Sequence, residues 1–158
     1  MKNPEEIITM LAATPRLLEE LINEIPPVQL KQHRIKNKWS IHEHACHIAI
    51  GDQYVFHPRL RAFINETDPT FTPYSGESFE KDFLIKMDLE KALINFKKLR
   101  MQSIELAKHF DRTQWQKESH HPEYSIYTPY IMLRHFLMHD YFHMYRIEEL
   151  WLTTEEFI

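Results

Sequence analysis

Four long segments of this chain repeat apolar residues at the spacing of an amphipathic helix, and no other feature restricts the fold as strongly. They run from about residue 4 to 25, 40 to 65, 78 to 110 and 128 to 152. In the first segment the apolar residues form one helical stripe, namely Ile7, Ile8, Leu11, Leu17, Leu18, Leu21 and Ile22. The 158 residues include only two glycines, fewer than a β-rich domain needs for its turns, which also favours helices.

Local signals refine the second segment. The stretch SIHE, from Ser40 to Glu43, is a capping box, in which the serine and glutamate side chains accept hydrogen bonds from each other's backbone amides at a helix start. Pro58 lies inside the segment and lacks the amide hydrogen that a helix interior needs. It therefore predicts a kink or break near His57.

Four helices of this length predict an all-α protein, a four-helix bundle that forms a single domain over residues 1–158. The connections, roughly 26–39, 66–77 and 111–127, are long and rich in proline, polar and aromatic residues. Long connections permit crossovers between parallel neighbours, so an up-down-up-down order does not follow from the pattern. No internal repeat or low-complexity segment indicates a second domain.

Composition excludes several classes of protein. The net charge is −4 with no long run of one sign, whereas a nucleic-acid-binding protein should show a basic patch. No apolar run approaches the about 18 residues of a membrane span, and the N-terminus lacks the apolar stretch of a signal peptide. The single cysteine, Cys46, excludes an internal disulfide. We expect a cytoplasmic protein that binds neither nucleic acid nor a membrane.

The stretch RHFLMHDYFHMYR, residues 134–146, carries His135, His139 and His143 at four-residue intervals. Residues four apart share one face of a helix, and apolar neighbours predict that this face is buried. A buried polar group without a partner costs about 1–3 kcal/mol, and a metal ion can serve as partner to two imidazoles. We favour the pair His139 and His143, although His135 and His139 have the same spacing.

A mononuclear catalytic metal site usually has three protein ligands, so another helix should supply a third histidine. We favour His47, because Gly51 lies one turn beyond it and leaves room for a ligand or substrate. His44 shares this face and is either a fallback ligand or a group behind the ligands, whereas His42 is expected to be exposed. Cys46 points about 100° away from His47 and is expected to be a buried, unreactive thiol.

The stretches KWSIHEHACHI and HDYFH together resemble the DinB/YfiT-like superfamily of metalloenzymes. The family pattern is a Trp-Ser pair at the start of the second helix, a histidine seven residues after the serine, and His-x-x-x-His near the C-terminus. Here the pattern corresponds to Trp39, Ser40, His47, His139 and His143. The order of helices and loops agrees over nearly the whole chain.

This resemblance implies a four-helix bundle with up-down-down-up connectivity. It also implies one divalent metal ion, nickel, zinc or iron, bound by His47, His139 and His143. The implied activity is that of a thiol-dependent S-transferase or isomerase that uses bacillithiol or mycothiol and acts on a small-molecule substrate. A hydrolase that uses an activated water is a variant with the same metal ligands.

Arg146 stands where family members often have glutamine. An arginine at this position could hold an anionic group of a substrate or thiol cofactor. A surface salt bridge with Glu148 or Glu149 is the interpretation that we prefer.

A different class of function stays open from the residues alone. The chain has 11 histidines, which raises the chance of accidental spacing. A non-catalytic four-helix bundle, with structural histidines or a structural metal, is therefore the alternative to an enzyme.

The chain closes with an apolar group that consists of Trp151, Leu152, Phe157 and Ile158. Chain ends usually fray unless they are packed against something. We therefore expect this end either to fold back onto the bundle or to dock on a second copy of the chain, and we favour the second alternative, a two-fold symmetric homodimer.

Overall fold

The computed structural model describes residues 3–73, 80 and 82–154. Its four long helical stretches match the expected bundle: α1 (Pro4–Glu24), α3 (Ile41–Gly51) continued by η1 (Asp52–Phe56) and α4 (His57–Asn65), α6 (Leu89–Lys108), and α8 (Pro129–Leu152). Three short helices lie between them: α2 (Pro27–Leu30), α5 (Phe83–Lys86) and α7 (Arg112–Gln116). The described residues form isolated β-bridges but no strand.

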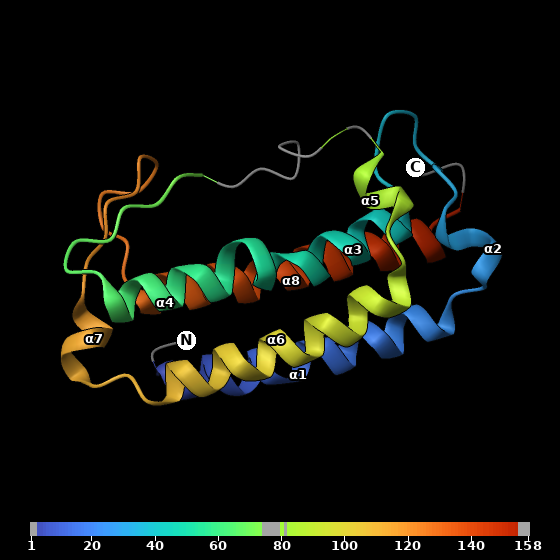
Figure 1. The fold of residues 1–158 in the computed structure, drawn as a ribbon. Coiled ribbons are helices and arrows are strands. Elements are labelled where there is room, and N and C mark those ends of the chain that lie inside the picture. Colours follow the sequence, from blue (N-terminus) through green and yellow to red (C-terminus); the bar gives the residue numbers. More distant parts are fainter. Residues whose placement is uncertain (1–2, 74–79, 81, 155–158) are drawn as a thin grey trace.

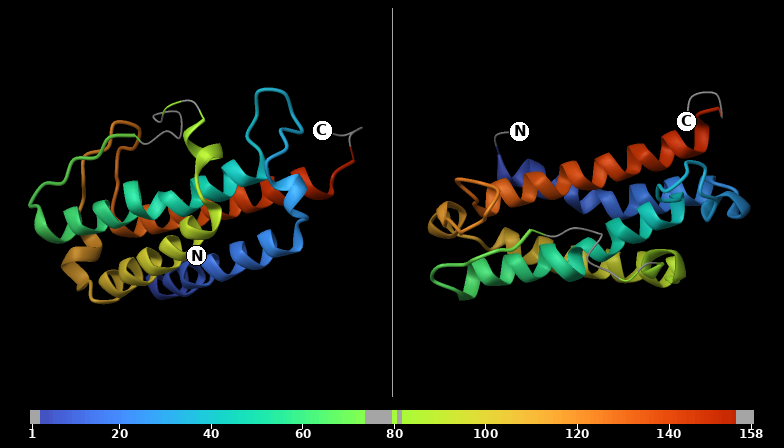
Figure 2. Two further views of the ribbon diagram at one scale, coloured as in Figure 1. Left: turned by 45° about the vertical axis from the view of Figure 1, so that its right-hand side comes forward. Right: turned by 90° about the horizontal axis from the view of Figure 1, so that it is seen from above.

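The helices follow the up-down-down-up order that the resemblance implied (Figure 1). Helices α1 and α8 run in one direction, and the α3–α4 stretch and α6 run in the other. Helix α1 packs against α6 and α8, and α3 packs against the same two helices, so α1 and α3 stand at opposite corners of the bundle. Helix α4 ends at one end of the bundle, and α6 begins toward the other end, as the right view of Figure 2 shows.

The irregularity that Pro58 predicts is a π-helical turn just before it. The amide of His57 donates to the carbonyl of Asp52, five residues back. The wider turn accommodates a residue without an amide hydrogen, so the helix continues into α4 instead of ending. Single π-helical turns are frequent at functional sites, and this one directly follows Gly51.

The predicted continuous helix over residues 78–110 is wrong. Met87 has an extended backbone, and α6 begins only after Asp88, whose side chain accepts a hydrogen bond from the amide of Lys91. Residues 78, 79 and 81 lie outside the described residues. The interruption frees the short helix α5 to pack on α3.

The expectation that His42 is exposed is also wrong, and α5 explains why. His42 is only 3 % exposed. It shares one face of α3 with Cys46 and Ile50, and Leu84 of α5 packs against both of these residues. Helix α5 therefore covers a face of α3 that would be exposed to solvent if the third segment formed one continuous helix.

The core consists of two apolar clusters with a charged layer between them. One cluster includes Leu11, Phe56, Phe63, Ile104 and Leu137, and the other includes Leu18, Ile22, Ile48, Phe96 and Ile147. Each of the four helical stretches contributes to this layer a buried polar residue that lies between the two clusters in sequence: Thr14, Asp52, Arg100 and Asp140. These four side chains are almost fully buried and contact one another.

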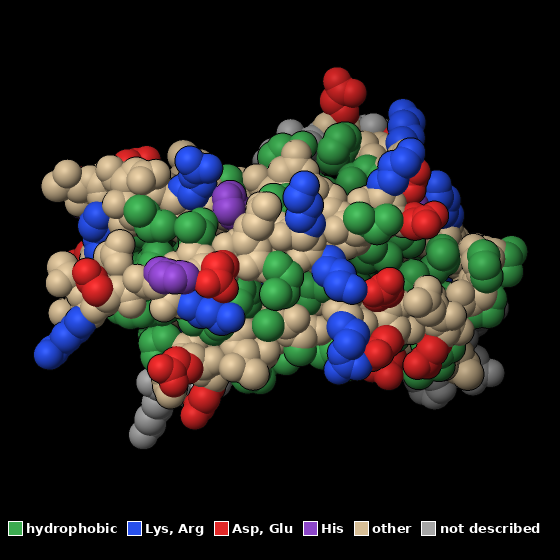
Figure 3. Space-filling model, turned by 60° about the horizontal axis from the view of Figure 1, so that its bottom comes forward, with side chains coloured by type: hydrophobic (Ala, Val, Ile, Leu, Met, Phe, Trp, Pro, Cys, Tyr) green, Lys and Arg blue, Asp and Glu red, His purple; other side chains and the backbone are tan. Residues whose placement is uncertain are grey.

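Acidic and basic side chains are interspersed on the face shown in Figure 3, where α1 and α6 lie, and no extended patch of one sign is visible there. Within the described residues, no helix is both long enough and apolar enough to cross a membrane.

Candidate metal centre

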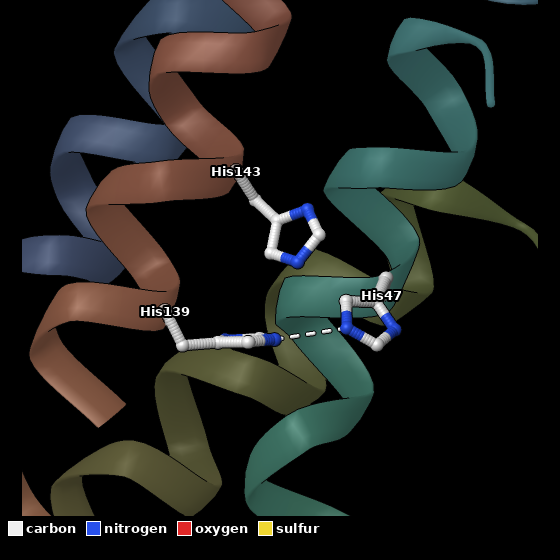
Figure 4. A group of neighbouring side chains, drawn as sticks. All are labelled: His47, His139 and His143. Atoms are coloured by element: carbon white, nitrogen blue, oxygen red, sulfur yellow. Dashed lines mark hydrogen bonds between the residues drawn. The ribbon is translucent and has the colours of Figure 1, made fainter. Parts of the chain in front are cut away.

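His47, His139 and His143 converge between α3 and α8, as the sequence predicts (Figure 4). Each offers a ring nitrogen, and these atoms all lie within 4.8 Å of one another. The two helices are antiparallel neighbours, so two histidines one turn apart on α8 can face one histidine on α3. The Nε2 atoms of His47 and His139 are 2.8 Å apart. Among the described residues, this is the group of three possible ligands that the fold brings together.

Burial keeps two of these imidazoles neutral. His47 is 5 % exposed and His143 is 8 % exposed. Burial, reinforced by the neighbouring histidines, lowers the pKa of His47 to about 3 and that of His143 to about 2. A neutral imidazole offers a lone pair, which is the form that binds a metal.

The other nitrogen of each α8 histidine faces a buried partner. The Nδ1 atom of His143 lies 2.8 Å from Nδ1 of His44, and Nδ1 of His139 lies 3.5 Å from a carboxylate oxygen of Asp140. Both histidines therefore keep Nε2 for the centre. Such partners behind the ligands fix the tautomer and the ring orientation. His44 therefore lies behind His143 and outside the group of three.

Asp140 is in turn held by the charged layer of the core. Its second carboxylate oxygen accepts hydrogen bonds from Arg100, at 2.8 Å, and from Thr14, at 3.0 Å. Arg100 also forms an ion pair with Asp52 at 2.8 Å. Burial alone would raise the pKa of Asp140, but Arg100 and His139 together hold that pKa below its ordinary value.

This charged layer was not predicted, although the sequence carries a signal for it. Arg100 stands four residues from both Phe96 and Ile104, and Asp140 stands four residues after Phe136. A charged side chain inside an apolar helical stripe predicts a buried ionic partner.

Trp39 forms one wall of the centre. Its ring centre lies 4.8 Å from that of His47 and 5.9 Å from that of His143. The predicted capping box is confirmed and fixes the chain at this point. Ser40 donates its amide hydrogen to the Glu43 carboxylate at 2.8 Å, and Glu43 donates its own to the Ser40 hydroxyl at 3.3 Å. The Glu43 carboxylate is therefore engaged in capping the start of α3.

Three other expectations concern nearby residues. Cys46 is fully buried, and burial raises the pKa of its thiol to about 12, so it is the unreactive thiol that we expected. Arg146 forms the preferred salt bridge with Glu149. His135 lies outside the group of three, with its ring centre 4.8 Å from that of Tyr124.

A pocket of about 230 Å³ opens beside His139, whose side chain is 32 % exposed. Gly51 lines it, as the sequence suggested. A Cβ atom there would lie 3.8 Å from the Phe136 ring and 4.0 Å from the His139 ring, so it would occupy space at this end of the pocket. The remaining lining residues are Val55, Arg59, Pro73, His121, Glu123, Tyr124, Tyr127, His135 and Phe136.

His120 and His121 are neighbours in a polar loop, which would predict that both are solvated, but the structure buries His121. His120 is exposed and bonds Asp68 at 3.2 Å, whereas His121 is 9 % exposed. The bridge between Thr70 and His120 joins two loops far apart in the sequence, and the His121 ring then packs against Tyr127, with centres 4.7 Å apart.

The fold is an up-down-down-up bundle, and three imidazoles converge beside a pocket. These two features define the class: a helical-bundle protein with a candidate metal-binding centre. The chain belongs to the DinB superfamily, whose sequence pattern matches residues 10–147. No curated protein matches the chain.

Among solved structures, the chain is similar to YfiT from Bacillus subtilis, which is described as a probable metal-dependent hydrolase with an unusual four-helix bundle topology. The TM-score is 0.82 at 21 % sequence identity, and the match covers 95 % of this chain and 88 % of that one. At this level of identity, the similarity establishes a shared fold.

Proposed function

We propose that the protein is a metal-dependent enzyme in which His47, His139 and His143 bind one divalent metal ion. The observation that carries this proposal is the convergence of three imidazoles beside a pocket that one of them, His139, lines. Three nitrogen donors suit zinc, nickel or iron, the metals that the family resemblance implies. Such an ion acts as a Lewis acid and lowers the pKa of a coordinated water or thiol.

For the reaction we propose transfer of a low-molecular-weight thiol, such as bacillithiol, to an electrophilic small molecule. A C–S bond forms while the bond between carbon and its leaving group breaks, and the thiol releases its proton. The chain itself supplies no suitable sulfur, because Cys46 is fully buried and its pKa is raised to about 12. The partly exposed His139 leaves the centre accessible from the pocket.

Hydrolysis by an activated water is the second candidate. It is supported by the description of YfiT as a probable metal-dependent hydrolase. It needs the same three histidines and differs only in the nucleophile that enters.

Elemental analysis of the purified protein, followed by two assays, tests these proposals. The first assay follows the reaction of 1-chloro-2,4-dinitrobenzene with bacillithiol, glutathione or cysteine, and the second follows hydrolysis of 4-nitrophenyl acetate without thiol. About one metal equivalent and a thiol-dependent rate that is lost in His139→Ala support transfer. A thiol-independent rate with the same loss supports hydrolysis instead. A metal-loaded protein that is inactive in both assays would favour the non-catalytic bundle, and a metal-free protein would refute the metal site.

The cytoplasmic location, the single domain and the lack of a nucleic-acid or membrane partner stay predictions. We also propose a homodimer, whose test is given below.

A further inference from the structure

Arg59 of α4 lines the pocket beside His139 and is held there by neutral groups. Its Nη1 donates to the Tyr127 hydroxyl at 3.1 Å, and its Nη2 donates to the Thr72 carbonyl at 2.6 Å. The guanidinium carbon also lies 5.1 Å from the centre of the Phe71 ring. These contacts orient the guanidinium but do not neutralise it.

Within the described residues, no carboxylate forms an ion pair with Arg59, whereas Arg100 has two buried aspartates and Arg146 has Glu149. A guanidinium is always charged and has five N–H donors in a planar fork. Tyr127 and Thr72 each take one of these, so three remain for a ligand. This fork matches a carboxylate, to which it can donate two parallel hydrogen bonds.

The rest of the pocket fits a small ligand with an apolar body. Val55 and Phe136 contribute apolar walls to the pocket that Arg59 and His139 also line. The volume of about 230 Å³ is below the about 300–1,000 Å³ of pockets for drug-sized ligands. Glu123 is the one acidic residue among the described lining residues, and it is exposed.

Two histidines add hydrogen-bonding groups to the pocket. Nδ1 of His121 accepts a hydrogen bond from the amide of Glu123, so a neutral His121 carries its proton on Nε2. His135 lines the same pocket, one helical turn before His139. His121 can donate a hydrogen bond from Nε2 to a ligand, and His135 can donate or accept one, without adding negative charge.

We propose that Arg59 binds the carboxylate of a small substrate, whose apolar body lies against Phe136 and Val55 and whose reacting end faces His139. The position of the reacting end rests on the proposed metal-dependent function. The carboxylate contact itself needs no metal. An experiment can therefore refute this contact without refuting the metal-dependent function, and the reverse.

NMR-detected titration of the full-length protein tests the carboxylate contact with benzoate and its neutral analogue benzamide as probes. The titrations are made before and after treatment with a chelator. We expect benzoate to bind in both states and benzamide to bind about ten- to a hundredfold more weakly, the range for loss of a hydrogen bond to a charged group. Benzoate binding that disappears with the chelator would show that the carboxylate binds a metal and would overturn the proposal.

Variants assign the preference to Arg59. Arg59→Met should abolish the preference for benzoate, and Arg59→Lys, which keeps the charge but loses the fork, should retain part of it. Arg61→Met removes an exposed arginine of the same helix outside the pocket and should change nothing. Glu123→Gln should strengthen benzoate binding. An unchanged preference in Arg59→Met refutes the proposal, and if that variant does not fold, a full preference in Arg59→Lys refutes the role of the fork.

The outcomes separate this inference from the proposed function. If the purified protein contains no metal but prefers benzoate through Arg59, the metal-dependent function fails and the carboxylate site stands. If metal is bound but wild type does not prefer benzoate over benzamide, the carboxylate site fails alone.

Discussion

The Nε2 atoms of His47 and His139 lie 2.8 Å apart, although the two residues are separated by 92 positions in the chain. This contact exists because α3 and α8 run antiparallel as neighbours in the bundle. The ring of His143, one turn further along α8, has its centre 4.6 Å from that of His47 and 4.5 Å from that of His139. The geometry of one helix pair therefore determines the whole triad.

Replacing a member of the triad should remove the metal without unfolding the bundle. His143→Ala leaves only two of the three ligands that a catalytic site usually has, so we expect metal content to fall from about one equivalent to near zero. Elemental analysis and circular dichroism measure the two effects. His120→Ala removes an exposed histidine and should keep the metal. Full metal content in His143→Ala would show that the ligand set is wrong.

His44 should raise the affinity for metal without binding it. His44→Ala removes the partner 2.8 Å from Nδ1 of His143 but leaves all three ligands. Loss of such a partner typically lowers metal affinity about 10- to 100-fold, which competition with a chromophoric chelator measures. His42→Ala is the matched control, because it removes a buried imidazole from the α5-covered face of the same helix. Equal losses in both variants would indicate a general loss of stability instead.

Arg100 should be essential for stability because of the charges that it neutralises. Arg100→Met leaves Asp52 and Asp140 buried without their cation. Breaking a buried ion pair from one side costs about 3–5 kcal/mol, and urea unfolding should show a loss of this size. Arg16→Met, which breaks an exposed pair with Glu20, should cost less than about 1 kcal/mol. Similar losses in the two variants would contradict the role of the buried layer.

The sequence predicted what depends on local signals. The limits of α1 and the start of α8 agree with the predictions within a residue, because proline and capping residues mark them. The histidine pair on α8 was also recognisable, because a spacing of four residues is a local pattern. His47 was identified among three histidines because Gly51 follows it on the same face.

The sequence could not show what depends on contacts between distant segments. The burial of His42 requires α5, and that helix exists only because Asp88 starts α6 late. The pocket depends on a similar contact, since the Arg59–Tyr127 hydrogen bond joins residues 68 positions apart. Neither contact has a periodic pattern that a reader of the sequence could detect.

The apolar surface of α8 supports the proposed homodimer. Met138, Phe142, Tyr145 and Leu152 lie near one side of this helix, and each is more than half exposed. The predicted contacts of Phe157 and Ile158 lie outside the described residues. Exposed apolar patches often mark interfaces between proteins. Light scattering should give twice the 19.2 kDa of one chain.

Two variants locate the dimer interface. Tyr145→Glu should convert the dimer into a monomer, because it places a charge inside the apolar patch. Ile94→Glu alters an exposed apolar residue of α6 and should have no effect. A wild-type mass near 19.2 kDa would refute the dimer and leave the metal site unaffected.

The last prediction concerns the pH dependence of stability, which follows from the burial of His42. Burial lowers the pKa of His42 below its ordinary value of 6.5. At a pH between the lowered pKa of His42 in the folded chain and 6.5, the unfolded chain binds a proton at His42 that the folded chain does not. The stability of the fold therefore falls as the pH falls below about 6.5, and for this one group the slope cannot exceed about 1.4 kcal/mol per pH unit.

Urea unfolding of chelator-treated protein between about pH 7 and pH 5 measures this slope. Other groups titrate in the same range, including Asp52, whose pKa burial raises to about 6, so the comparison between variants is decisive. His42→Phe should flatten the dependence, because phenylalanine has no proton to bind when the chain unfolds. His109→Phe, which changes an exposed histidine, should keep the wild-type slope. If His42→Phe also keeps it, His42 titrates alike in the folded and unfolded chains, and α5 does not cover it in solution.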